Sequence, residues 1–289
     1  MSSQSLNGAA SPLSDTIQGI GIGLRSQHYQ YILNNKPSTP WFEVLTDNYM
    51  GDGGQPLDYL EKIRVNYPVT FHGVGMSLGS AGPLNMDYMR RLKSLMDRFE
   101  PAWVSDHACW NASGKHYSHD LLPLPYTDEA VRLLANKILQ VQDFLGEQII
   151  IENVSSYVEF SHSSKTEWQF LNAVIEEADC GLLFDVNNIY VNTINHNQNA
   201  EEFIENINSN RIKEIHLAGY EDHGSHLLDT HGYPVHDPVW TLYRLAIESF
   251  GNIPTLIEWD TDIPDFRILE EEARKAEIIQ TCVQDVRAA

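Results

Sequence analysis

The chain is poor in cysteine and in basic residues. Its three cysteines, Cys109, Cys180 and Cys282, are odd in number and widely spaced, so the sequence predicts neither a disulfide framework nor a CxxC metal site. Nineteen Lys and Arg face 40 Asp and Glu, which gives a formal net charge of −21. Because proteins bind a phosphate backbone mainly through cationic side chains, we expect no nucleic acid partner.

Long hydrophobic runs and phosphate-binding loops are also missing. No apolar run approaches the roughly 20 residues of a membrane-spanning helix, and neither GxGxxG nor GxxxxGK[ST] occurs. Residues 1–16 are polar and rich in serine, without the basic start and apolar core of a secretory signal. We therefore interpret residues 1–16 as a disordered N-terminal tail, and we expect a cytoplasmic protein that does not associate with a membrane.

What the sequence does contain is an alternation of short β-rich runs and longer segments with helical spacing. Segments 85–99 and 129–145 show the clearest helical spacing of apolar residues. Strict alternation indicates a parallel sheet covered on both faces, and eight repeats favour closure into a barrel. We predict a single (β/α)8 TIM barrel over 17–289. Its expected strands are 17–24, 41–46, 68–74, 102–107, 147–153, 180–186, 211–217 and 253–259.

Six of these expected strands end in a residue type that binds metal ions. In a barrel the carboxyl ends of the strands meet at one mouth, where several carboxylates would repel one another unless cations neutralised them. Any one such residue is commonly just a hydrogen-bonded polar group, but the whole set indicates at least two metal ions. The residues are His72, His107, Glu152, Asp185, His216 and Glu258.

These six residues divide into two predicted ion sites. One ion takes His72, His107 and Glu152, and the second takes Glu152 with Asp185, His216 and Glu258, so that Glu152 is the bridge. All donors are nitrogen or oxygen, which suits Fe, Mn, Zn, Co or Ni and leaves the metal open.

The segment 218–238, after the seventh expected strand, is rich in histidine and aspartate. Asp229 and His231 can point to one face of an extended chain and suit a third ion or a mobile lid, although a solvated polar loop is the alternative. His223 and His226 are expected to face solvent. Asp237 is expected to be the N-cap of the next helix, with Pro238 in its first turn.

Several polar residues near the strand ends have weaker claims. They either hold a ligand in place or are plain turn residues: Asn48, Asn153, Asn187 and Asp260. Strand alternation places Asn187, and not Asn188, on the face of Asp185. Glu43 lies inside the second expected strand. Residues 113–127 are expected to form a long loop over the mouth.

Eight segments together resemble one enzyme family. They are TFHGVGMSLGS, WVSDHACW, HDLLPLPYT, IIIENVSSY, LLFDVNNIYVN, EIHLAGY, LLDTHG and LIEWD. In this order and spacing they resemble the multinuclear non-haem iron-dependent oxidative enzymes of the methanobactin-biosynthesis-oxidase type, over residues 17–280. The resemblance implies a xylose-isomerase-like TIM barrel with two or three Fe ions. Such an enzyme uses O2 to modify cysteine residues of a ribosomally synthesised precursor peptide, usually with a separate peptide-recognition partner protein.

The resemblance also implies where iron binds. Its ligand positions fall on His72, His107, Glu152, Asp185, His216 and Glu258 for two ions, and on Asp229 and His231 for the third, with Asn188 as a further companion. Two other enzymes on such a barrel stay open, a divalent-metal isomerase, which usually needs a Lys near the metals, and a phosphodiesterase, which needs a basic rim. A non-enzymatic metal-binding scaffold is the third alternative.

Overall fold

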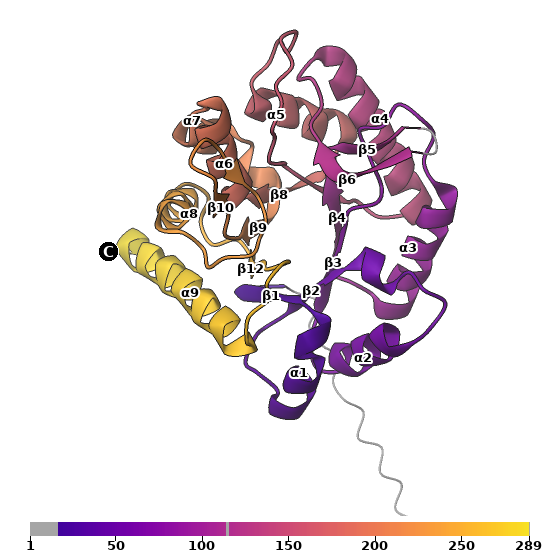
Figure 1. The fold of residues 1–289 in the computed structure, drawn as a ribbon, viewed down its shortest axis with the longest axis vertical. Coiled ribbons are helices and arrows are strands. Elements are labelled where there is room, and N and C mark those ends of the chain that lie inside the picture. The colour runs from indigo at the N-terminus through magenta and orange to yellow at the C-terminus, as the bar shows by residue number, and fades with distance from the viewer. Residues whose placement is uncertain (1–16, 114–115, 289) are drawn as a thin grey trace, which may run out of the picture.

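A computed structural model describes residues 17–113 and 116–288, so the predicted tail 1–16 lies outside the described residues. Eight parallel strands form a closed barrel in the order β1-β2-β3-β4-β7-β8-β9-β12 (Figure 1). Each strand lies within its predicted range, which confirms the (β/α)8 barrel. The strands are β1 (Ile20–Leu24), β2 (Phe42–Leu45), β3 (Val69–Gly73), β4 (Val104–His107), β7 (Ile150–Glu152), β8 (Gly181–Asp185), β9 (Ile212–Leu217) and β12 (Thr255–Ile257).

Helices surround the barrel as an outer ring (Figure 1). They are α1 (Tyr29–Asn35), α2 (Gln55–Arg64), α3 (Met86–Phe99), α4 (Asp128–Leu145), α5 (Glu167–Ala178), α6 (Val186–His196), α7 (Ala200–Asn206), α8 (Asp237–Phe250) and α9 (Phe266–Ala288). Three short 3-10 turns are η1 (Ser26–His28), η2 (Thr46–Tyr49) and η3 (Ser209–Arg211). No described helix is long and apolar enough to cross a membrane.

Side chains at the helix starts satisfy free backbone N–H groups. Asn85 accepts hydrogen bonds from the backbone of Asp87 and Tyr88 at the start of α3, and Thr166 and Gln169 form a reciprocal capping box at the start of α5. The predicted N-cap of α8 was wrong by one residue, because α8 already includes Asp237 and its N-cap is His236. Pro238 stands in the first turn as predicted.

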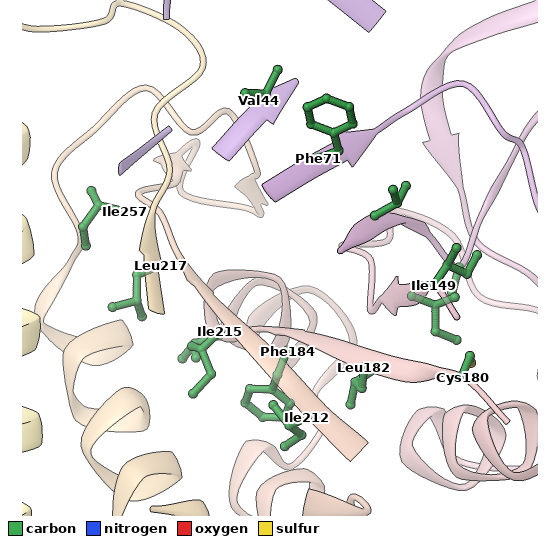
Figure 2. Packing of buried hydrophobic residues seen from close by; sticks show 14 of the residues in the cluster. Val44, Phe71, Ile149, Cys180, Leu182, Phe184, Ile212, Ile215, Leu217 and Ile257 are labelled. Carbon is green, nitrogen blue, oxygen red and sulfur yellow. The ribbon is translucent and has the colours of Figure 1, made fainter. Parts of the chain in front are cut away.

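The apolar core lies between the strands and the helix ring. Phe71 of β3 packs edge-on against Phe99 of α3, with ring centroids 6.4 Å apart. The Phe184 ring of β8 contacts aromatic rings of α7 and α8 at 5.8 and 5.2 Å. Figure 2 shows part of this layer, with Leu182 and Phe184 of β8 beside Ile212 and Ile215 of β9. Since alternate residues point outward into this layer, the residues between them point into the barrel.

Two glycines of β1 make room inside the barrel. A Cβ at Gly21 would lie 2.4 Å from the ring of Trp41, which is fully buried, and a Cβ at Gly23 would lie 2.9 Å from the guanidinium of Arg25. The small residues of β1 therefore let one large apolar and one cationic side chain occupy the interior.

The predicted loop 113–127 contains regular structure. β5 (Trp110–Ser113) and β6 (His116–Leu122) pair as an antiparallel hairpin, so the expectation of a plain loop was wrong. Antiparallel pairing of β5 with β6 satisfies backbone groups that a plain loop would leave to water. A second small hairpin, β10 (Glu221–Asp222) and β11 (Leu227–Leu228), forms within the 218–238 segment.

Candidate metal centre

Six predicted residues meet at the carboxyl end of the barrel. Each is at most 7% exposed: His72, His107, Glu152, Asp185, His216 and Glu258. The strand register makes neighbours of several of them. His107 is paired with Glu152 across β4 and β7, and Asp185 with His216 across β8 and β9. The strand ends therefore converge as the sequence predicts.

The first group consists of His72, His107 and Glu152. The Nε2 atoms of His72 and His107 lie 3.3 and 3.1 Å from Oε2 of Glu152. This oxygen is buried and has no hydrogen-bond partner among the described residues. Donor atoms that bind one ion at about 2.1 Å lie about 3 Å from one another. The three side chains thus have the spacing of ligands around a shared ion.

The other ring nitrogens of these two histidines are held by the barrel. Nδ1 of His72 is 2.7 Å from Oγ of Ser105, and Nδ1 of His107 is 3.2 Å from the carbonyl oxygen of Gly73. A fixed partner on one ring nitrogen leaves the other with a lone pair and a set direction, as metal-binding histidines require. Both Nε2 atoms are therefore presented to Glu152.

The second group shares Glu152 with the first. Glu152, Asp185 and His216 have donor atoms that all lie within 4.8 Å of one another. Nδ1 of His216 is 3.9 Å from Oε1 of Glu152 and 3.0 Å from Oε2 of Glu258. Oδ2 of Asp185 is buried without a hydrogen-bond partner among the residues described. Each Glu152 oxygen thus faces one group, which is the geometry of the predicted bridge.

Two carboxylates inside the barrel lie against His216 on its other side. Nε2 of His216 is 3.2 Å from Oε2 of Glu43 and 3.6 Å from Oε1 of Glu214, whose other oxygen accepts a hydrogen bond from Nε1 of Trp103 at 2.7 Å. Sequence reasoning gave Glu43 only a weak claim and missed Glu214. The usable signal was strand alternation, since Glu214 lies two residues before His216 and so on the same face.

A third group lies around His231. Its Nε2 is 2.6 Å from Oδ1 of Asp229, and its Nδ1 is 3.2 Å from Oε2 of Glu258. His231, Glu258 and Asp185 also have donor atoms within 4.8 Å of one another. His231 has a φ of 47°, in the left-handed region that residues other than glycine rarely adopt, and its carbonyl accepts a hydrogen bond from the backbone of Asp260 at 2.7 Å.

The surroundings of the third group fix its side chains. Asp229 accepts hydrogen bonds from Oγ of Ser155 at 2.9 Å and Nδ2 of Asn187 at 2.7 Å. Oδ2 of Asp260 is 3.2 Å from Nδ1 of His231, and the other oxygen of Asp260 pairs with Arg25. Arg25 was not predicted as a site residue, because it follows the end of a strand whose other residues are apolar or glycine.

The asparagines of 187–188 do not follow strand alternation. Residues Val186–His196 are the helix α6, so that expectation was wrong. Nδ2 of Asn188 lies 3.4 Å from Oε1 of Glu152, and the Asn188 backbone donates to Oδ1 of Asp185 at 2.6 Å. Asn188 therefore lies at the Glu152 side of the centre, whereas Asn187 contacts Asp229.

The remaining predicted support residues behave differently from one another. Asn153 is buried and exchanges two hydrogen bonds of 2.9 Å with the backbone of Asp185, which ties the end of β7 to the end of β8. Asn48 is exposed in η2, away from the metal pocket lining, and so is not brought to the centre. His223 and His226 are exposed, as expected.

The centre concentrates buried negative charge. Burial raises the pKa of Glu43 to about 8, that of Asp185 to about 7 and that of Glu152 well above its usual range. Burial opposes protonation of His107, but the nearby Glu152 raises the pKa of His107 to about 9. Without cations these groups hold protons, which metal ions displace when they bind. The unpartnered oxygens of Glu152 and Asp185 fit such ions.

A cavity of about 190 Å³, here called the metal pocket, opens onto these groups. Apolar side chains of Leu45, Val74, Leu121 and Val154 form part of its wall, and His72, His107, Glu152 and His231 form another part. Its size admits a single side chain beside the ligand groups. A substrate residue that entered would exchange water for an apolar wall and a row of donors.

Comparison with known sequences identifies the family. The sequence model described as RiPP precursor modification enzyme MbnB/TglH/ChrH matches residues 19–281. The chain belongs to this family. RiPP stands for ribosomally synthesised and post-translationally modified peptide, so the family comprises enzymes that modify precursor peptides. The family resemblance of the eight sequence segments is thereby confirmed.

Relatives of this MbnB/TglH/ChrH family member align over nearly their whole length. The UPF0276 protein of Acaryochloris marina (strain MBIC 11017) is 58% identical over 261 residues, which cover 90% of this chain and 94% of the relative. The UPF0276 protein of Anaeromyxobacter sp. (strain Fw109-5) is 48% identical and covers 90% of this chain and 92% of its own.

Solved structures similar to the MbnB/TglH/ChrH member share its fold. D-psicose 3-epimerase of Clostridium cellulolyticum H10 with D-tagatose has a TM-score of 0.58 at 10% identity, covering 92% of this chain and 99% of its own. Endonuclease IV of Thermus thermophilus has 0.57 at 12%, covering 92% and 97%. A fusion protein of a xylose isomerase-like TIM barrel and 4-hydroxyphenylpyruvate dioxygenase has 0.55 at 12%, covering 91% and 41%. The fold is therefore a xylose-isomerase-like TIM barrel.

Proposed function

We propose that this chain is a multinuclear iron, O2-dependent oxidative enzyme that modifies cysteine residues of a ribosomally synthesised precursor peptide. One observation carries the proposal. Three ligand groups at the barrel mouth overlap, the first two through Glu152 and the last two through Asp185. Overlap of this kind suits two or three ions at bridging distance better than one ion with an open position.

The choice of iron rests on donor chemistry and on family membership. All donors are imidazole nitrogen or carboxylate oxygen, a set compatible with iron and with open positions for oxygen chemistry. Bound iron would supply a Lewis acid for a substrate thiol and a store of electrons, with O2 as the oxidant. Family membership supports the substrate, a precursor peptide.

The protein residues would hold and orient the reaction. We propose His72, His107 and Glu152 as ligands of one ion and Glu152, Asp185 and His216 of the next, with Glu258 between the second and third. Asp229 and His231 hold the third ion. Asn153, Asn187, Asn188 and Asp260 keep these ligands in place through the contacts given above. The apolar wall of the metal pocket limits water around an entering cysteine side chain.

A separate peptide-recognition partner protein is also part of the proposal. The described residues form the barrel, its helices and two short hairpins. The metal pocket accepts one side chain, whereas a precursor peptide presents many residues, so we expect a partner to hold most of the peptide. We also propose that the protein works in the cytoplasm.

Two other functions on this fold have less support. An isomerase usually uses a lysine near its metals, and no lysine lines the metal pocket in the described part of the chain. The nearby cation, Arg25, is paired with Asp260. A phosphodiesterase is disfavoured by the formal charge of −21. A metal-binding scaffold would show no O2 consumption with a cysteine-containing peptide.

The test uses protein purified without oxygen and reconstituted with Fe(II). The substrate is the short cysteine-containing peptide encoded beside the gene, and the control is the same peptide with Cys replaced by Ser. We expect O2 uptake and a mass change in the Cys peptide alone. Equal O2 uptake with both peptides, or less than one iron per chain after reconstitution, would contradict the proposal.

A further inference from the structure

A second cavity, here called the side cavity, lies next to the metal pocket. Its volume is about 380 Å³, compared with about 190 Å³ for the metal pocket. The segment after β7 and the starts of α5 and α7 enclose it. Its walls combine four aromatic rings, Tyr126, Phe160, Trp168 and Phe203, with three carboxyl groups, Glu159, Glu167 and Glu202.

The charge of the side cavity is negative. Among the described residues that line it, Lys165 is the basic one, and its Nζ lies 2.6 Å from Oδ1 of Asp128. Glu159 and Glu202 are exposed at the rim, whereas Glu167 is 5% exposed. Oε1 of Glu167 receives no hydrogen bond from the described residues, while Oε2 accepts one from Asn192 at 3.2 Å.

The helix ends at the side cavity do not reverse this charge. Helix N-termini attract anions, but Thr166 already accepts a hydrogen bond from the backbone of Gln169 in α5, and Asn199 accepts one from the backbone of Glu202 in α7. The nearest histidine contact is Nδ1 of His196, 3.6 Å from Oε2 of Glu159. The cavity therefore offers carboxylates and aromatic faces to a guest.

Two chain segments connect the side cavity to the metal pocket. Leu121 lines the metal pocket and Pro123 lines the side cavity, and likewise Ser155 lines the metal pocket and Ser156 the side cavity. The wall between them is thus one or two residues thick. An extended peptide advances about 3.3 Å per residue, so a residue about two to four positions from one in the metal pocket reaches the side cavity.

We propose that the side cavity binds a basic side chain, Lys or Arg, of the precursor peptide, about two to four positions from the residue that enters the metal pocket. The long apolar stem of such a side chain packs against the aromatic rings, and its cationic head lies over a ring face and near the carboxylates. The identity of the peptide rests on the proposed function. Binding of the side chain itself needs no metal.

The test measures binding of single blocked amino acids by calorimetry, with no metal present. The probes are Nα-acetyl-arginine N-methylamide and its citrulline analogue, which has the same shape without the charge. The proteins are the wild type, the double variant Glu159→Gln/Glu202→Gln, and the control Glu176→Gln/Glu177→Gln. The control loses the same charge from exposed positions at the far end of α5.

We expect the arginine probe to bind the wild type and the control equally and the Glu159→Gln/Glu202→Gln protein at least five-fold more weakly. The citrulline probe should bind the wild type at least five-fold more weakly than arginine. Equal binding of the two probes, or equal binding to all three proteins, would overturn the proposal. Since no iron is involved, failure of the oxidative function leaves this result unaffected.

A second measurement links the side cavity to the peptide. In the precursor peptide, replacing the basic residue nearest the modified cysteine by Gln should raise KM at least five-fold and leave kcat unchanged. The Glu159→Gln/Glu202→Gln enzyme should lose this difference. If the arginine probe binds but KM does not change, the site does not serve the peptide and the assignment is wrong.

Discussion

At the scale of single residues, Glu152 has the central place in the candidate metal centre. Its Oε2 faces His72 and His107, while its Oε1 faces His216. The side chain is 1% exposed, and Oε2 has no hydrogen bond among the residues described. A buried carboxylate without partners is costly unless a proton or a cation neutralises it. Metal binding gives this side chain its energetic reason.

Glu152→Gln should remove at least one iron per chain. The amide keeps the shape of the side chain but replaces one bridging oxygen by a nitrogen that carries two hydrogens and cannot bridge two ions. The measurement is iron content after anaerobic Fe(II) reconstitution and desalting. Glu129→Gln, at an exposed position in the first turn of α4, is the control and should keep full iron. Unchanged iron in Glu152→Gln would show that Glu152 is no bridge.

Arg25→Lys should weaken the third ion site and spare the first. Arg25 pairs with Asp260, which contacts His231, and its Nε donates to the carbonyl oxygen of Trp259 at 3.1 Å. Lysine keeps the charge but cannot make both contacts. Loss of such supporting contacts commonly lowers metal affinity about 10- to 100-fold. Fe(II) titration should show one weakened site, whereas the exposed control Arg267→Lys should titrate as wild type.

The predicted ligand residues could be found from sequence because each ends an apolar β-rich run. Arg25, Glu43 and Glu214 could not be found in that way. Their roles depend on which face of a strand points inward, and on side chains from other strands that meet them inside the barrel. Asn188 was placed by family resemblance beside Asp229, whereas its contact with Glu152 follows from the helical start of α6.

At the scale of elements, short segments after the strands shape both cavities. The β5–β6 hairpin ends near Leu121 and Pro123, and the segment after β7 supplies Ser155 and Ser156. Helix α5 then begins with Thr166 as N-cap and Glu167 as its first residue. A buried acid in the first turn is favoured by the helix dipole but opposed by its loss of water.

Glu167→Gln should flatten the pH dependence of stability of the metal-free protein. Burial raises the pKa of Glu167 to about 8 from 4.5, while Asn192 lowers it by a hydrogen bond. Between these pH values the folded state holds a proton that the unfolded state has released. Stability is therefore full at low pH and falls as pH rises, by about 1.4 kcal/mol per pH unit. Gln mimics the protonated acid and removes this slope.

Urea unfolding at pH 5.5, 6.5 and 7.5 checks the Glu167 prediction. The difference in unfolding free energy between Glu167→Gln and wild type should grow with pH in favour of the variant. Glu176→Gln, exposed in the same helix, should run parallel to wild type. Parallel curves for Glu167→Gln would mean that Glu167 ionises normally in the folded protein.

The positions of the barrel elements could be predicted better than their detail. Eight apolar runs in strict alternation with helices leave little choice of fold. The hairpin β5–β6 was missed because residues 110–122 are mostly polar, and its pairing depends on backbone contacts rather than on an apolar pattern. The N-cap of α8 was displaced by one residue because Asp and Pro both suit the first turn.

At the scale of the whole molecule, the charge of −21 links stability to metal. Several of the acidic groups are buried together at the barrel mouth, so the metal-free fold carries their repulsion or their protons. Ions that bind the folded state alone stabilise it by about 2.7 kcal/mol at a hundred-fold excess over Kd. For a chain of this size that corresponds to a rise in Tm of roughly 5–10 °C.

Fe(II) should therefore raise the Tm of the metal-free protein, and EDTA should reverse the rise. The measurement is anaerobic thermal unfolding across a series of Fe(II) concentrations. Glu152→Gln should show a smaller rise, because it lacks the shared ligand. A wild-type Tm that does not respond to Fe(II) would mean that the buried acids are neutralised by protons alone.

The most direct test is a crystal of iron-reconstituted protein measured on both sides of the iron absorption edge. The difference maps should show two or three iron peaks at the barrel mouth, one bound by His72, His107 and Glu152 and the next sharing Glu152 with Asp185 and His216. A third peak should lie by Asp229 and His231. No iron peak in contact with Glu152, or a single peak elsewhere, would contradict a multinuclear iron centre.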